Sequence, residues 1–216
     1  SEISLNDRNL NSSEGTADKK LKAWSDINWQ KAERFVNRLQ IRIAKATASG
    51  DLNFAKRLGY LLTHSFYAKA LAIKSVCSNK GKNTPGIDGV IWKTDAEKLS
   101  ALSQLDDKNY TPRPLRRVYI EKYGKKEKRP LSIPTMRDRA MQTLYKVAMD
   151  PIAETNADNT SFGFRRFRGP HNAMQYAFTL LSRRYSPQWV LEGDIKGCFD
   201  NISHTWLLEN APMDKG

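Results

Sequence analysis

A short basic stretch with strand periodicity interrupts a chain that is otherwise patterned for helices. In residues 116–122 the apolar Val118 and Ile120 alternate with polar neighbours, and residues 128–133 form a second strand-like segment after a turn at residues 123–127. Together they predict an antiparallel β-hairpin. Because helical patterns precede and follow it, the expected fold is α/β (α+β), rich in helices and carrying one basic β-hairpin.

Positive charge is concentrated around this hairpin. The 216-residue chain has 36 lysines and arginines against 23 acidic residues, a net charge of +13. Between Thr111 and Lys146 there are eleven basic residues and three acidic ones. A surface that served only solubility would mix the two signs, so the pattern indicates a polyanionic partner. A hairpin this basic suits phosphate better than it suits a core.

Cysteine and hydropathy patterns bear on where the protein works. Cys77 and Cys198 match neither a zinc-binding spacing nor a disulfide framework, which indicates a reduced protein. No apolar segment approaches membrane-spanning length, and the N-terminus is polar and unlike a signal peptide. We therefore expect a cytoplasmic protein without a membrane partner.

Helical patterns with end signals precede the hairpin. Residues 1–26 are expected to form a flexible tail. A helix is predicted from Trp29, with Asn28 as its N-cap and Gly50 as its stop. Residues 52–76 predict a second long helix with Leu58, Leu61 and Leu62 on its core side. The other face of the first helix is either a solvated surface or a nucleic-acid contact, and carries Lys31, Arg34, Arg38, Arg42 and Lys45.

Further loops and helices follow. The glycine-containing residues 78–89 form either a phosphate-approaching loop or a plain surface loop. Capping pairs open helices at Thr94 and Thr135. Another helix is predicted from Pro170 to about Tyr185, and its inward residues are expected to be Ala173, Met174, Ala177, Phe178 and Leu181.

Two segments carry the candidate chemistry. Phenylalanines and arginines interleave in residues 161–169, and rings beside guanidinium groups suit single-stranded nucleic acid or a template backbone. Residues 189–191 predict a short buried strand that presents Asp194 at its end. Asp194 and Asp200, with Phe199 beside them, suit a hard divalent cation. The alternative is that both aspartates cap local structure.

In this order the segments resemble the N-terminal half of the reverse transcriptases encoded by bacterial group II introns, also called maturases. The resemblance covers roughly residues 27–215. It is carried by residues 80–89 (KGKNTPGIDG), 114–120 (PLRRVYI), 128–135 (KRPLSIPT), 138–142 (DRAMQ), 161–165 (SFGFR) and 194–200 (DIKGCFD).

The resemblance implies a right-hand polymerase, with the N-terminal extension and fingers in residues 27–188 and the start of the palm in residues 189–216. The implied activity is RNA-directed DNA polymerisation by two-metal nucleotidyl transfer, with Mg²⁺, dNTPs, a DNA primer, and intron and template RNA.

The resemblance also implies residue roles. Asp194 would be the catalytic, metal-binding aspartate, helped by the carbonyl of Ile195, and Phe199 would screen the sugar 2′ position. Lys122 and Arg129 would hold the triphosphate, with Arg165 near the nucleotide. The RNA-binding candidates are Arg116, Arg117, Lys125, Lys126, Arg166, Arg168, Arg34, Arg38 and Arg42.

The sequence departs from the family pattern. Glu121, Ser132 and Arg166 replace a proline, a glycine and a proline, and the second acidic motif, an aromatic, any residue and two aspartates, does not follow Asp200. The chain alone is expected to be inactive, as a fragment or as one piece of a split enzyme whose second chain supplies the rest of the palm and the thumb. The alternatives are a non-catalytic RNA-binding maturase module that aids splicing, or the reverse transcriptase of a CRISPR-associated system.

Overall fold

The computed structural model describes residues 23–108, 110–121, 123–124 and 128–213. Lys122, Lys125 and Lys126, and most of the expected N-terminal tail, lie outside these residues. The described part begins with a short 3-10 helix, η2 (Trp24–Asp26), in which the buried Trp24 packs on Trp29 with ring centroids 5.2 Å apart. Packed structure therefore begins ahead of residue 27, where the tail was expected to end.

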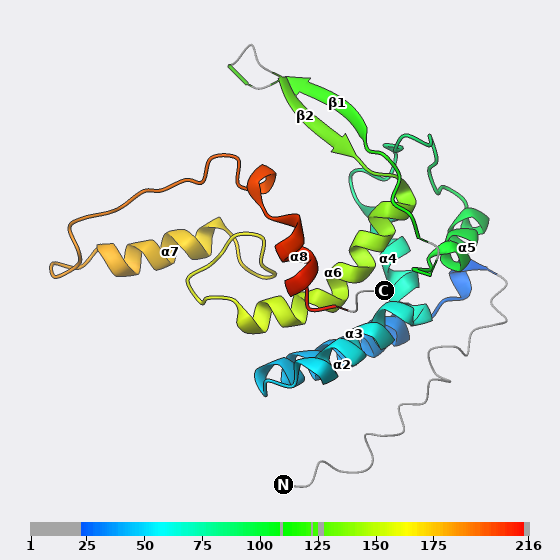
Figure 1. Cartoon of the computed structure of the whole chain (residues 1–216), viewed down its shortest axis with the longest axis horizontal. Helices are drawn as coiled ribbons and strands as arrows, with labels where there is room; N and C mark the ends of the chain where they lie inside the picture. The colour runs from blue at the N-terminus through cyan, green and yellow to red at the C-terminus, as the bar shows by residue number, and fades with distance from the viewer. Residues whose placement is uncertain (1–22, 109, 122, 125–127, 214–216) are drawn as a thin grey trace, which may run out of the picture.

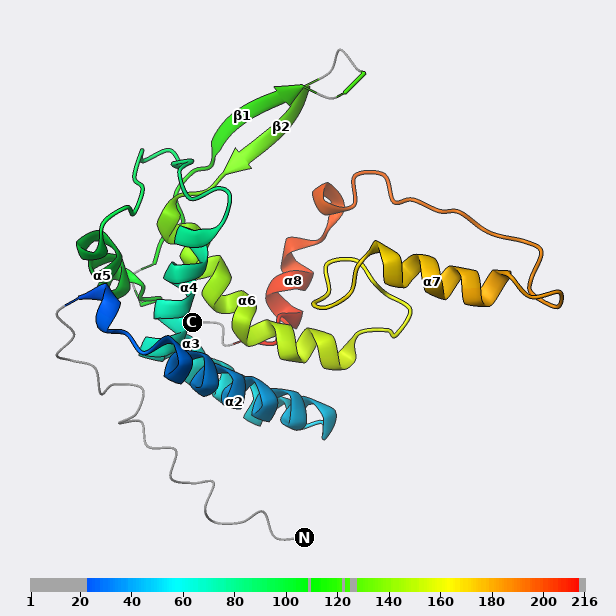
Figure 2. The ribbon, with the colours of Figure 1, turned by 180° about the vertical axis from the view of Figure 1, so that it is seen from behind.

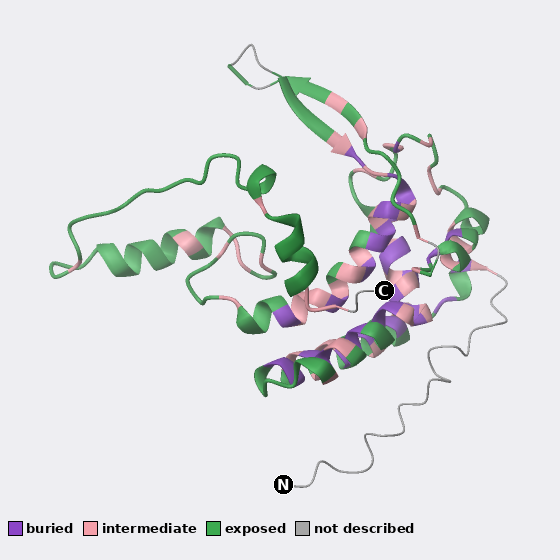
Figure 3. Ribbon diagram, viewed as in Figure 1, coloured by how far each residue is buried: buried purple, intermediate pink, exposed green. Residues whose placement is uncertain are grey.

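Four helices form the main body: α2 (Trp29–Ala48), α3 (Leu52–His64), α4 (Phe66–Ser78) and α6 (Met136–Asn156), as Figures 1 and 2 show. The prediction of α2 is confirmed together with its ends, because the Lys31 N–H donates to Asn28 Oδ1 at 2.9 Å and Gly50 has a φ of 79°. The buried faces of these helices meet in one core, which is purple in Figure 3. Its largest fully buried side chains include Ile43, Leu58, Leu62 and Ile73.

The prediction of one long helix over residues 52–76 is wrong, because the helix is interrupted at Ser65. Ser65 has an extended backbone, with φ −74° and ψ 141°, and separates α3 from α4. Its hydroxyl donates to the Leu62 carbonyl at 2.8 Å and accepts the Ala68 N–H at 3.2 Å, so one side chain caps both helices. The predicted core side of α3 is right in part: Leu58 and Leu62 are buried, whereas Leu61 is 54% exposed.

Helix α6 continues through Pro151 because a neighbouring helix compensates for the missing donor. Proline has no N–H, so the Val147 carbonyl, four residues earlier, loses its partner within the helix. The side-chain amide of Gln40 on α2 donates to that carbonyl at 2.8 Å. This hydrogen bond ties α2 to the middle of α6.

The predicted hairpin is confirmed. Strand β1 (Arg116–Glu121) pairs antiparallel with β2 (Lys128–Ile133), and the ribbon extends away from the helices in Figures 1 and 2. Helix α5 (Asp95–Gln104), also predicted, begins with a capping box in which the Thr94 N–H donates to Glu97 Oε2 at 2.7 Å and the Glu97 N–H donates to Thr94 Oγ1 at 3.3 Å.

The prediction of a buried face on the helix after Pro170 is wrong. Helix α7 (Pro170–Leu181) ends four residues earlier than expected and has no buried residue. Met174 and Phe178, expected to face inward, are 68% and 72% exposed. Figures 1 and 3 show why: α7 lies to one side of the helical body, where the described chain places no second layer against it.

The predicted buried strand at residues 189–191 is also absent. The segment is an exposed coil in which Trp189 is 93% exposed and Leu191 96%. A strand requires neighbouring strands to satisfy its backbone groups, and in the described chain the one sheet is the hairpin β1–β2. A short 3-10 helix η3 (Phe199–Asn201) and helix α8 (His204–Asn210) follow, and α8 is capped by Ser203, whose Oγ accepts the Trp206 N–H at 3.2 Å.

No helix of the described residues is both long and apolar enough to traverse a bilayer.

Candidate functional site

The hairpin presents its arginines on an exposed ribbon. Arg129 pairs with Ile120, and Arg116 pairs with Ile133. Paired residues share one face of an antiparallel ribbon, and every second residue along a strand returns to that face. Arg129 and Arg116 therefore lie on the same face, with apolar residues between them, whereas Arg117 lies on the opposite face. Arg129 and Arg117 are both exposed.

Arg139 anchors the loop of residues 79–86 beside the base of this hairpin. Its guanidinium donates to three carbonyls: that of Pro134 at 3.0 Å, that of Gly81 at 3.0 Å and that of Thr84 at 2.5 Å. Burial, with the nearby charge of Arg116, lowers the pKa of Arg139 below its ordinary value. Because the loop turns two of its carbonyls toward this arginine, it is a packed structural loop in this region.

Gly86 completes the same junction by a close approach of two backbones. A Cβ at Gly86 would lie 2.6 Å from Thr135 Cα and 2.7 Å from Thr135 N. Only glycine fits this contact. The loop is thereby pressed against Thr135, which follows the hairpin and caps α6.

Asp138 is buried in the first turn of α6. Its carboxylate accepts the Tyr110 hydroxyl and the Thr135 hydroxyl, both at 2.6 Å, while the Asp138 N–H donates to Thr135 Oγ1 at 3.1 Å. Burial and the adjacent carboxylate raise the pKa of the Tyr110 phenol, which keeps its proton as donor. The capping pair was visible in the sequence. The Tyr110 partner of Asp138 was not visible, because it is distant along the chain. The contacts of Arg139 and Gly86 were not visible either, because they are made to backbone atoms.

Arg139→Met is expected to destabilise the chain by about 2–3 kcal/mol, because methionine retains an apolar stem but leaves three carbonyls without their donor. Arg117→Met, on the exposed side of the hairpin, is the matched control and is expected to change stability by less than about 0.5 kcal/mol. Urea unfolding followed by circular dichroism measures both. Equal midpoints for the two variants would contradict the anchoring role.

Asp194 lies in an exposed coil. Among the described residues its carboxylate makes no hydrogen bond or ion pair, and Ile195 and Phe199 are 72% and 79% exposed. Gly197 turns the chain with a φ of 61°, and its carbonyl accepts the Asn201 side-chain amide at 2.8 Å. Figures 1 and 2 show the segment between α7 and α8 standing apart from the hairpin.

The donor set around Asp194 fits magnesium in kind and is incomplete in number. A carboxylate and a backbone carbonyl are the oxygen ligands that Mg²⁺ prefers. Within the described ranges, however, no three histidine, cysteine or acidic side chains gather as a metal site would require. Any ion at Asp194 therefore needs further ligands besides those of this segment.

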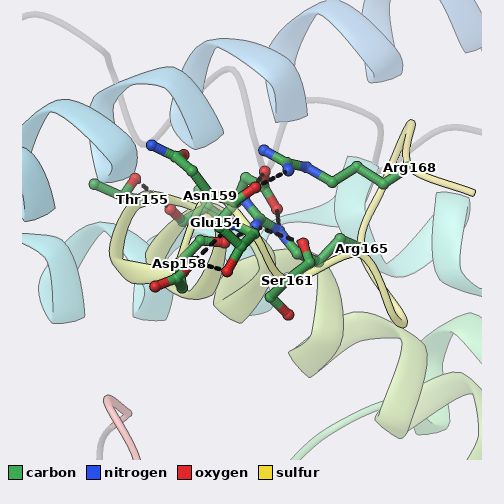
Figure 4. A network of polar contacts seen from close by, with 9 residues as sticks. Glu154, Thr155, Asp158, Asn159, Ser161, Arg165 and Arg168 are labelled. Carbon is green, nitrogen blue, oxygen red and sulfur yellow. Dashed lines mark hydrogen bonds and ion pairs between the residues drawn. The ribbon is translucent and has the colours of Figure 1, made fainter. Parts of the chain in front are cut away.

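Arg165 is enclosed in a polar network that organises the loop after α6, shown in Figure 4. Its guanidinium contacts both carboxylate oxygens of Glu154, at 2.5 and 2.9 Å, and donates to the carbonyls of Asp158 at 2.5 Å and Ser161 at 3.0 Å. The side chain of Arg165 is only 10% exposed. Nearby, Arg168 donates to the Asn159 carbonyl at 2.8 Å, and Arg166 pairs with Asp150 at 3.4 Å.

The ion pair changes the titration of Glu154. Hydrogen bonding from Arg165 lowers the pKa of the Glu154 carboxyl. A lowered carboxyl pKa means that the interaction is fully present above the ordinary pKa and is lost as the pH falls through the lowered value. The loop is therefore held most firmly at neutral pH.

The basic face predicted for the first helix is present on α2. Arg34 and Arg38 are exposed, and the Arg34 Nε donates to the Gln30 carbonyl at 3.3 Å. Arg42 is partly covered and lies over the Phe54 ring, 5.8 Å from its centroid. The face therefore offers exposed guanidinium groups in successive turns of one helix.

Comparison with known families covers most of the chain. Residues 24–105 match a family described as the N-terminal domain of reverse transcriptase. Residues 120–213 match the family described as reverse transcriptase (RNA-dependent DNA polymerase). The two matches are consecutive along the chain and are separated by residues 106–119.

The chain is also similar to individual proteins, among them one encoded by a group II intron. The chain is 38% identical to the group II intron-encoded protein LtrA of Lactococcus lactis over 170 residues, which are 77% of this chain and 28% of that protein. It is 35% identical to protein YkfC of Escherichia coli over 181 residues, 81% of this chain and 47% of that protein. It is 33% identical to an uncharacterized 91 kDa protein in the cob intron of Schizosaccharomyces pombe over 143 residues. The chain thus spans less than half of the length of these curated relatives.

Proposed function

Because the chain belongs to the reverse transcriptase family of group II introns, we propose that it forms the fingers and the beginning of the palm of an RNA-directed DNA polymerase. In this proposal residues 27–188 supply the N-terminal extension and fingers, and the palm begins at residue 189. The observation that carries it is the exposed Asp194, whose carboxylate is free of partners among the described residues and so is free to bind a cation.

Asp194 and the carbonyl of Ile195 would hold Mg²⁺, together with acidic ligands from outside this segment. When bound, the metal stabilises the negative charge that develops on the reacting oxygens. The Arg129 guanidinium would contact phosphate oxygens in a bidentate manner, and Lys122 would add a mobile positive charge. The Phe199 ring would exclude the 2′-hydroxyl of a ribonucleotide. Arg165, fixed by Glu154, would border the nucleotide and template path.

A primer-extension assay tests this proposal. The 216-residue chain, supplied with an RNA template, a DNA primer, dNTPs and Mg²⁺, is expected to make no cDNA, because it lacks the second acidic motif. Addition of a chain that carries the aromatic-x-Asp-Asp motif and the thumb is expected to restore synthesis. Accumulation of cDNA by the chain alone would show that the site is complete without that motif.

The exposed arginines of α2 favour a second candidate, an RNA-binding module that assists intron folding without catalysis. In that case Arg34→Glu/Arg38→Glu would abolish splicing support while Asp194→Ala would change nothing. The polymerase proposal expects Asp194→Ala to abolish cDNA synthesis and to leave RNA binding intact. Parallel splicing and cDNA assays on the two variants separate the candidates.

A further inference from the structure

Two phenylalanines of the loop after α6 are held in a conformation that their side chains disfavour. Phe164 has a φ of 61° and Phe167 a φ of 59°, and in the described part of the chain no other non-glycine residue has a positive φ. For a bulky residue this region of backbone space is costly and persists only where the surroundings impose it. Both side chains are fully exposed, at 103% and 100%. The backbone strain thus presents two aromatic rings to solvent.

The network around Arg165 imposes this conformation. Arg165, one of the two residues between the rings, is held by Glu154 and by the carbonyls of Asp158 and Ser161 (Figure 4). In contrast, Phe162 turns inward: its ring lies 5.7 Å from the Tyr176 ring and 5.6 Å from the Arg168 guanidinium, measured to the ring centroids. The loop therefore separates one inward ring from two outward ones.

The two outward rings border a hollow whose charged lining residues form two ion pairs, Arg165 with Glu154 and Arg166 with Asp150. Phe164, Phe167 and Arg166 line a cavity of about 360 Å³ together with Pro151 and Gln40. The volume falls in the range of small-molecule pockets, about 300–1,000 Å³. The Arg166 side chain is 58% exposed while it pairs with Asp150, so its guanidinium stands at the edge of the cavity and is accessible to solvent.

We infer that Phe164 and Phe167 form a stacking platform for the bases of single-stranded nucleic acid, held in position by the Glu154–Arg165 ion pair. The inference deepens the proposed function and rests on it for the identity of the partner. Aromatic rings beside guanidinium groups are the pattern by which proteins bind unpaired bases and their phosphates, and the chain carries a net charge of +13.

Equilibrium binding of the 216-residue chain to a fluorescein-labelled single-stranded oligoribonucleotide tests the platform, without dNTPs or divalent metal. Phe164→Leu/Phe167→Leu is expected to weaken binding about tenfold or more, because leucine keeps the apolar volume but cannot stack. The dependence of affinity on salt should stay unchanged, since no phosphate contact is lost. Phe178→Leu, at an exposed phenylalanine on α7, is the matched control and should bind normally.

A glycine pair separates binding from folding. Phe164→Gly/Phe167→Gly is expected to raise the melting temperature, because glycine accepts positive φ, and yet to weaken oligonucleotide binding. Glu154→Gln should weaken oligonucleotide binding although both rings are present, because glutamine removes the negative charge that pairs with Arg165.

Unchanged affinity in the leucine or glycine pair would overturn the platform. So would an equal loss of affinity for a blunt duplex, whose bases are already stacked. The binding test can contradict the platform without contradicting the polymerase proposal, because it is carried out without dNTPs or divalent metal. If the complemented primer-extension assay fails while ring-dependent binding persists, the platform stands and the polymerase proposal falls.

Discussion

Asp194→Ala is expected to reduce cDNA synthesis by the complemented enzyme by roughly a thousandfold, the upper end of the losses caused by removing one preorganised electrostatic contact to a reacting centre. The proposed role of Asp194 is to bind the metal through a carboxylate that alanine lacks. Since this carboxylate makes no contact within the described residues, the variant should fold normally. Initial rates of primer extension, at equal concentrations of folded protein, measure the effect.

Glu192→Ala is the matched control for this prediction. Glu192 is an exposed acid in the same coil, so its removal changes the local charge equally without removing the proposed ligand. The rate of cDNA synthesis by Glu192→Ala should stay within about threefold of that of the parent enzyme, as expected for a screened surface charge. Equal losses in the two variants would mean that net charge matters here and that Asp194 is not a ligand.

Gly86→Ala is expected to destabilise the chain by about 3 kcal/mol or more, the upper range for overpacking in a tight site. The new Cβ would lie 2.6 Å from Thr135 Cα, a backbone atom that cannot rotate away. Separation of the two backbones would also weaken the hydrogen bonds from Arg139 to the loop. Because Thr135 caps α6 and lies two residues after the end of β2, the hairpin that carries Arg129 would shift too. Chemical unfolding gives the stability.

Gly163→Ala provides the comparison, because an added Cβ there meets no atom within 4 Å and the residue has no positive φ. It should cost less than about 0.5 kcal/mol. If Gly86→Ala were equally mild, the loop would have room to move away from α6, and the junction would not be rigid.

Local patterns predicted most of the elements. The caps at Asn28, Thr94, Thr135 and Ser203 each join residues three positions apart, so the sequence contains both partners of each interaction. The hairpin followed from alternation and a turn. The wrong predictions concern residues whose burial or backbone conformation depends on neighbours. Helix α7 and residues 189–191 have apolar patterns but pack against no layer of the described chain. Ser65 interrupts a helical pattern that is periodic on both of its sides.

The candidate site was likewise predicted only in part from the sequence. The order of motifs was sufficient for the sequence to indicate the family, and comparison with known proteins confirms that family. Roles for Asp194, Lys122, Arg129, Phe199 and Arg165 remain proposals. The junction of Gly86 and Arg139 could not be predicted, since a guanidinium and carbonyls 55 and 58 positions apart leave no periodic signal.

The sequence by itself determined several helix caps and the hairpin, where positive charge is concentrated, and to which family the chain belongs, because these depend on residues close together or on motif order. Only the tertiary structure decided which apolar faces are covered, which arginines hold the fold rather than face solvent, and which phenylalanines point outward. Burial and hydrogen bonding between distant segments are properties of the packed chain, and no local pattern encodes them.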